Sequence, residues 1–225
     1  MSTDAAHTAN LPTFRAALLW MKSRWLFGVI TLIIALLSIA VGLVAIASGT
    51  GLIPLPYEMF LLAERMPVVF RVHMITGAAA LLLAPVVIVL RHRPYWHRML
   101  GRVVGAFVVV AGLTALPVAI FSDSSTIARA GFFVQGIVWM GLLARGILAI
   151  RSGDRSRHAR YMVAMVAVTS GAVWFRVITG SAILLDLPFA PIYAAAAWLG
   201  WIIPLTLVLA FPAFQHSLFP SPRPA

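Results

Sequence analysis

The chain has 225 residues, of which 62% are hydrophobic and only 10% are charged, and its mean hydropathy of +0.99 excludes a soluble globular domain. The formal net charge of +11 comes from 17 Lys and Arg residues against 6 Asp and Glu residues. Because these cations lie between apolar runs rather than along one folded face, they favour topology signals and contacts with membrane lipids, and they argue against nucleic acid as a partner.

The first 24 residues begin as a polar segment and then combine apolar and basic side chains, which predicts a cytoplasmic tail with a short interfacial helix. The first apolar run covers residues 25–48, and Ala45-Ile46-Ala47 near its end resembles a signal-peptidase site. Since this run is longer than the ~7–15 apolar residues of a signal sequence, we expect an uncleaved membrane anchor.

Five further apolar runs follow, each close to the ~20 residues that a helix needs to cross ~30 Å of hydrocarbon. Their approximate ranges are 67–90, 103–121, 129–150, 161–184 and 191–212. Runs of this length favour helices over the shorter alternating strands of a membrane barrel. The sequence therefore predicts an all-α integral membrane protein, with a bundle of six transmembrane helices over residues 25–212 and a cytoplasmic tail over residues 213–225.

Two basic turns, at 91–102 and 151–160, separate the second span from the third and the fourth from the fifth. We expect both turns, and with them both termini, on the cytoplasmic side. When the turns are aligned with one extra residue in the second, His97 coincides with His158. This match predicts a parallel repeat of two helical hairpins about an axis along the membrane normal.

Histidine and methionine are the only soft metal ligands in this chain, because it contains no cysteine. Two imidazoles that face each other across a helical bundle hold a b-type haem, so His97 and His158 are candidate ligands of one haem iron. Arg98, Arg102 and Arg160 lie where they would pair with the haem propionates. The alternative is that both histidines lie among lipid headgroups without a cofactor.

Ionisable residues within the predicted spans indicate a second candidate site near the outer end of the bundle. His73 lies near the outer end of the second span, and Arg176 lies ~24 Å along the fifth span from residue 160. Charged groups at such depth face the bundle interior or a wet cavity. The expected outer pocket contains Arg71, His73, Gln135 and Arg176, with Glu58 or Glu64 as carboxylate partner and Trp139 and Trp174 along its wall. The alternative is a structural salt bridge from Arg176 to one of these glutamates.

Short motifs surround these candidate residues: Arg71-x-His73 with Gly77, then His97-Arg98-x-x-Gly101-Arg102, then His158 with Met162 and Arg176. They resemble a family of predicted bacterial membrane proteins catalogued as domain of unknown function 2306. The resemblance covers about residues 65–210 and implies a multi-pass protein of the bacterial inner membrane. The histidines are also loosely similar to those of b561-type cytochromes, which bind two haems. Because no second outer histidine is present to pair with His73, we expect one haem or none.

Two functions are consistent with these features. One is a membrane redox component with a haem between His97 and His158 and a quinone in the outer pocket, where Arg176 orients a carbonyl or anionic oxygen and His73 exchanges a proton. The other is a cofactor-free transporter or assembly protein that binds a solute in the same pocket. The sequence contains no P-loop, His-Glu-x-x-His motif or nucleophile elbow, which disfavours an ATP-driven pump or a conventional hydrolase.

Overall fold

The computed structural model describes residues 11–55 and 57–210. Side chains are described from Trp25 onward, apart from those of Leu26, Phe27, Tyr57 and Glu58. The predicted tail at 213–225 lies outside the described residues. Every regular element within them is a helix: α1 (Leu11–Thr50), α2 (Tyr57–Arg65), α3 (Pro67–Val89), the 3-10 turn η1 (Leu90–His92), α4 (Pro94–Phe121), α5 (Thr126–Arg151), α6 (Arg155–Thr169), α7 (Gly171–Leu184) and α8 (Phe189–Ala210).

Six helical stretches of the described chain are long and apolar enough to cross a membrane, which confirms the predicted all-α bundle. They are Gly28–Thr50, Pro67–His92, Pro94–Phe121, Thr126–Arg151, Arg155–Leu184 and Phe189–Ala210. The third and fifth stretches begin several residues before the predicted runs, because the basic residues after each turn are already helical. Pro94 begins α4, where its missing N–H group leaves no helical hydrogen bond unmade.

The chain divides into two compact units, Met1–Ile39 and Ala40–Ala225. Helix α1 runs without interruption from Leu11 to Thr50, so the residues predicted as an interfacial helix form the first part of a longer helix. All residues of the sites described below belong to the second unit.

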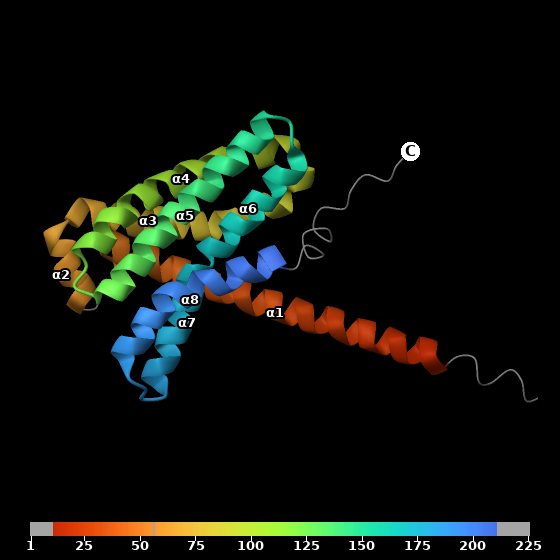
Figure 1. Ribbon diagram of the computed structural model, residues 1–225, viewed down its shortest axis with the longest axis horizontal. Helices are drawn as coiled ribbons and strands as arrows, with labels where there is room; N and C mark the ends of the chain where they lie inside the picture. The colour runs from red at the N-terminus through yellow and green to blue at the C-terminus, as the bar shows by residue number, and fades with distance from the viewer. Residues whose placement is uncertain (1–10, 56, 211–225) are drawn as a thin grey trace, which may run out of the picture. The chain divides into compact units, whose positions relative to one another are not determined.

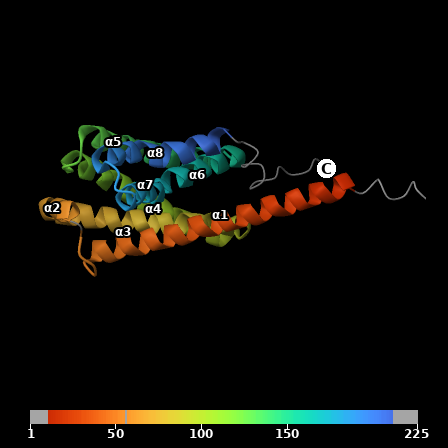
Figure 2. The ribbon, with the colours of Figure 1, turned by 90° about the horizontal axis from the view of Figure 1, so that it is seen from below.

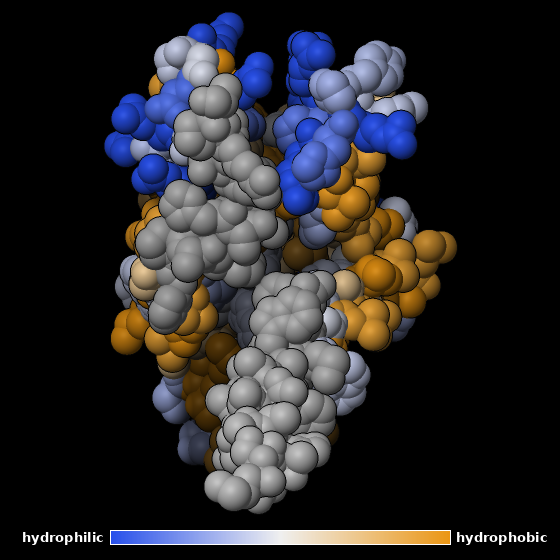
Figure 3. Space-filling view, turned by 90° about the vertical axis from the view of Figure 1, so that its right-hand side faces the viewer, coloured by the Kyte–Doolittle hydropathy of each residue, from blue (hydrophilic) through white to orange (hydrophobic). Residues whose placement is uncertain are grey.

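Within the second unit, α3 packs against α4, α5 against α6, and α7 against α8, and α8 also contacts α5 and α6. The turn between α3 and α4 lies at the same end as the turn between α5 and α6 (Figure 1), and the two turns are in different layers when seen from below (Figure 2). Hydrophilic side chains gather in the upper part of Figure 3, which looks onto this end of the molecule. We call this end the basic end and the opposite end the far end.

The fifth span is interrupted at Ser170, which separates α6 from α7, although the sequence predicts one continuous helix there. The Thr169 hydroxyl donates to the carbonyl of Met165 (2.8 Å), and the Ser170 hydroxyl donates to that of Ala167 (2.7 Å). Such hydroxyl-to-carbonyl bonds compete with the helical ladder and bend helices. The interruption lies deep in the span and brings the first turn of α7 to a cavity.

Small residues let α7 approach α8 closely beside this interruption. A Cβ atom added at Gly171 would lie 2.9 Å from Cβ of Trp201 and 2.7 Å from Nε2 of Gln135. One added at Gly200 would lie 3.3 Å from the carbonyl oxygen of Gly171. Close backbone contacts through glycine are a common way to pack helices in a membrane, where the hydrophobic effect does not drive helix association. They fix the position of α7, which carries Arg176.

Candidate functional site

A cavity of about 280 Å³ lies in the half of the bundle nearer the far end. Helices α3, α4, α5 and α7 form most of its wall, together with the last part of α1, one face of α2, the end of α6 and Tyr193 of α8. It extends from the loop between α4 and α5 down to the interruption at Ser170. Most of its lining is apolar, and its polar lining residues are His73, Ser122, Asp123, Ser124, Gln135, Trp139, Thr169, Arg176 and Tyr193.

His73 projects from α3 and forms a hydrogen bond across to α4. Its Nδ1 lies 3.0 Å from the carbonyl oxygen of Ala111. Because a carbonyl oxygen only accepts, the hydrogen belongs on Nδ1, and Nε2 of the neutral ring is an acceptor. His73 therefore offers the cavity a proton acceptor whose tautomer is fixed by the backbone of α4.

Arg176 supplies the cavity with a cation from α7. Its Nη1 donates to the carbonyl oxygen of Ala172, one turn earlier (2.9 Å), and the side chain is half-buried. Tyr193 and His73 are close enough to interact with it electrostatically. No carboxylate among the described side chains forms an ion pair with Arg176. A guanidinium carries five N–H donors, so this one is equipped to bind an oxygen-rich group.

Gln135 and Trp139 are one turn apart on α5, and both hold the interrupted span in place. Nε2 of Gln135 donates to the carbonyl oxygen of Val168 (3.2 Å). Nε1 of Trp139 donates to the hydroxyl oxygen of Thr169 (2.8 Å). These bonds stabilise the bent backbone just before Ser170, so both residues position α7 and also line the cavity.

Three aromatic rings form one wall of the cavity beside Arg176. Phe175 packs edge-to-face against Phe132 and Tyr193, with ring centroids 5.2 and 5.0 Å apart. Phe132 and Tyr193 also meet edge-to-face, at 6.1 Å. Aromatic faces and edges of this kind favour a flat or ring-shaped apolar group in the adjacent space.

The structure does not bring every predicted pocket residue to the cavity. Arg71 and Glu64 are exposed and do not line the cavity. Glu64 forms no ion pair with a described side chain. The side chain of Glu58, the other predicted partner, lies outside the described residues. Residues two positions apart on a helix point about 200° away from each other. His73 and Arg176 therefore face the cavity, whereas Arg71 and Trp174 do not.

The candidate haem ligands lie elsewhere, toward the basic end. Nδ1 of His97 is 2.9 Å from the carbonyl oxygen of Val87, and Nδ1 of His158 is 2.8 Å from that of Gly146. Each imidazole thus bonds to the preceding helix of its own hairpin, in the same manner in both, and neither lines the cavity. The three predicted propionate partners, Arg98, Arg102 and Arg160, are exposed, and Nε of Arg98 donates to the carbonyl of Pro94 (3.1 Å).

Helix α2 lies between the predicted runs at 25–48 and 67–90, where the sequence analysis predicted no helix. Met59 and Leu62 of α2 line the cavity, and Arg65 at its end forms an ion pair with Asp123 (2.8 Å). The signal was the pattern of residues 57–65, where Met59, Leu62 and Ala63 share one helical face.

A protein-family model described as a predicted membrane protein, DUF2306, matches residues 70–211 of this chain. The match includes both basic turns and all nine polar residues that line the cavity. No curated protein and no solved structure matches the chain, so the looser likeness to b561-type cytochromes gains no support from these comparisons.

Proposed function

The chain belongs to the DUF2306 family of predicted membrane proteins, and we propose that it binds, within the membrane, a small molecule with a ring-shaped apolar body and a carbonyl or carboxylate head. Arg176 carries this proposal, because it is a half-buried cation in a cavity without a described carboxylate partner. Ionisable residues inside membrane spans are costly and are therefore commonly functional.

The two ionisable groups deep in the cavity are complementary to such a head. Arg176 donates to a carbonyl or carboxylate oxygen, and Nε2 of His73 accepts from a hydroxyl group or an undissociated acid. The rings of Phe132, Phe175 and Tyr193 pack against the body of the molecule. Quinones and quinols belong to this chemical class, as do aromatic carboxylic acids.

The interruption of the fifth span at Ser170 supports the same use of the cavity. Transporters commonly place a substrate site where a membrane helix is broken, because freed backbone groups and helix ends then face the ligand. Here the break places Gly171 and Ala172 on the cavity wall. Binding at this point suits either a carrier of the solute or the quinone-binding part of a redox protein.

A thermal-stability series on the purified protein tests this proposal. A molecule that binds only the folded state at 100 times its Kd stabilises it by about 2.7 kcal/mol. We expect a fully substituted short-chain benzoquinone or an alkylbenzoate to raise Tm in a saturable way, and the matching alkylbenzene to leave it unchanged. Equal shifts with the alkylbenzene would show that only nonspecific apolar partitioning is being measured and would contradict the proposal.

A redox role with one b-type haem is the second candidate, favoured by the matching bonds of His97 and His158. Each Nδ1 is engaged by a backbone carbonyl, which leaves each Nε2 as the nitrogen available to a metal. Metal-ligating histidines usually have this arrangement, since the second nitrogen fixes the ring and its tautomer. A bound haem would supply one-electron chemistry; this chain would contribute the two imidazoles.

The visible spectrum decides this second candidate. If protein expressed with ample haem contains it stoichiometrically, the Soret band should sharpen on reduction with dithionite. That band should be lost in both His97→Ala and His158→Ala, and retained in His92→Ala, because His92 is an exposed histidine of the same basic end. A colourless wild-type protein would refute the haem proposal and leave the cavity proposal unaffected.

A further inference from the structure

The mouth of the cavity is marked by residues that face both the cavity and the outside. Asp123 lines the cavity, yet its side chain is 53% exposed. It lies in the loop between α4 and α5, flanked by Ser122 and Ser124, which also line the cavity. A side chain with both properties stands at the boundary between the cavity and its surroundings, so this loop forms one edge of the opening.

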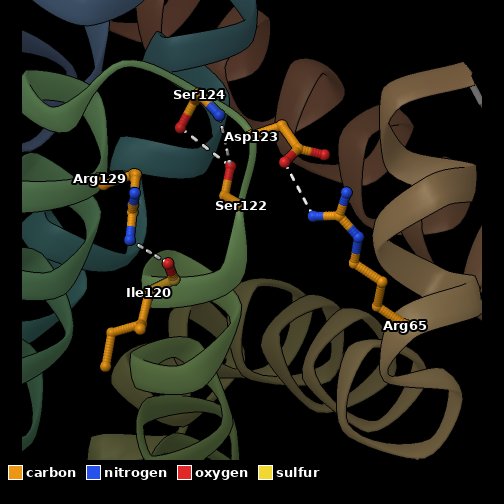
Figure 4. A network of polar contacts seen from close by, with 6 residues as sticks. All are labelled: Arg65, Ile120, Ser122, Asp123, Ser124 and Arg129. Carbon is orange, nitrogen blue, oxygen red and sulfur yellow. Dashed lines mark hydrogen bonds and ion pairs between the residues drawn. The ribbon is translucent and has the colours of Figure 1, made fainter.

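Helix α2 forms the opposite edge. Met59 and Leu62 line the cavity, while Phe60 and Glu64 are exposed on its other face. At the end of α2, Nη1 of Arg65 reaches Oδ1 of Asp123 at 2.8 Å (Figure 4). Among the described residues, the ion pair of Arg65 and Asp123 joins these two edges.

The loop is held so that Asp123 faces α2. The Ser122 hydroxyl donates to the Ser124 hydroxyl (2.9 Å), and the backbone N–H of Ser124 donates to the Ser122 oxygen (3.2 Å). These bonds close the loop on the side away from Arg65, as Figure 4 shows. Arg129, in contrast, binds the carbonyl of Ile120 and takes no part in the pair.

We propose that the Arg65–Asp123 pair is the entrance of the cavity and selects molecules by charge. This inference rests on the proposed function, because it concerns access to the same binding site. An exposed ion pair contributes little to stability, so it opens readily. An incoming anionic head competes with the Asp123 carboxylate for Arg65 and then passes inward to Arg176. Arg65 is thus a specificity-determining residue outside the deep site.

Charge-selective thiol labelling tests the entrance without requiring the natural ligand. The chain contains no cysteine, so a single Ala115→Cys substitution creates the only thiol. Ala115 is partly buried on α4 and lines the cavity, and Ala172→Cys on α7 provides a second reporter. Each reporter is reacted at low salt with an anionic sulfonate methanethiosulfonate and with its cationic trimethylammonium counterpart. The measured quantity is the ratio of the anionic rate to the cationic rate.

We expect Asp123→Asn to raise this ratio about fivefold and Arg65→Gln to lower it by a similar factor, because each leaves one uncompensated charge at the mouth. Combining Arg65→Asp with Asp123→Arg should restore the wild-type ratio, and added salt should reduce all differences. Arg129→Gln is the control, since it removes a cation near the far end that does not line this cavity.

The proposal would be overturned if Asp123→Asn and Arg65→Gln left the labelling ratio unchanged at both reporters. It would also be overturned if Arg129→Gln changed the ratio as much as they do. Its failure is distinguishable from failure of the proposed function. A charge-dependent entrance with no binding of quinone or carboxylate would refute only the function, whereas saturable binding with unchanged labelling ratios would refute only the entrance.

Discussion

Replacing Arg176 with Ala should weaken binding of the alkylbenzoate probe about 10- to 100-fold. A hydrogen bond to a charged group contributes about 1.5–3 kcal/mol, and every 1.4 kcal/mol is a tenfold change in Kd. Among the described residues, no other Arg and no Lys lines the cavity, so no neighbouring cation replaces the guanidinium of Arg176. The measurement is the Kd from calorimetric titration of the detergent-solubilised protein.

Arg145→Ala provides the matched control for this loss. Arg145 also lies within a membrane-spanning helix, but it is exposed and does not line the cavity. It should leave Kd unchanged. Arg176→Lys should recover part of the affinity, because the charge returns without the planar set of donors. Equal affinities in wild type and Arg176→Ala would contradict the assigned role, and a lower Tm without lost affinity would favour a structural role for Arg176.

Trp139→Ala should cause the largest loss of stability of any single substitution discussed here. Trp139 is only 8% exposed, belongs to the buried core cluster and donates to Thr169 at the helix interruption. Truncating a buried Trp costs about 3–5 kcal/mol in protein cores, because packing contacts are lost and a void remains. Denaturant or thermal unfolding in a fixed detergent measures the change.

Two further variants separate packing from hydrogen bonding at this position. Trp139→Phe keeps most of the ring but removes the N–H donor, so it should cost only about 1 kcal/mol. Trp96→Ala removes a 51% exposed tryptophan near the basic end and should change stability by less than about 0.5 kcal/mol. If Trp96→Ala destabilised the protein as much as Trp139→Ala, burial of Trp139 in the core cluster would not explain its effect on stability.

Hydrophobic length alone was sufficient to predict the six spans, because each apolar run is long enough to satisfy its backbone within a helix. It was insufficient to locate helix ends, since the arginine-rich residues after each turn continue the helix toward the headgroups. It also did not predict the break at Ser170. Thr, Ser and Gly all occur within continuous membrane helices, so Thr169-Ser170-Gly171 alone does not indicate a break. The bend depends on partners contributed by α5 and α8.

The depth of a residue along its helix and the direction of its side chain around the helix were not equally predictable for the candidate site. Depth along each helix predicted one level for His73, Gln135 and Arg176, and all three line the cavity. Direction excludes Arg71, which is two residues from His73 and so points away. The Arg65–Asp123 pair joins residues 58 positions apart through a short helix, and no local pattern in the sequence links its two members.

Protection of the Ala115→Cys thiol by the alkylbenzoate is the most direct test that the cavity is a binding site. With Arg176 intact, saturating alkylbenzoate should slow thiol labelling at least about tenfold, because the ligand occupies the space beside the thiol. With Arg176→Ala added, the same concentration should give little protection. Labelling that proceeds at one rate with and without the carboxylate, under conditions where the probe raises Tm, would place binding elsewhere and contradict the account.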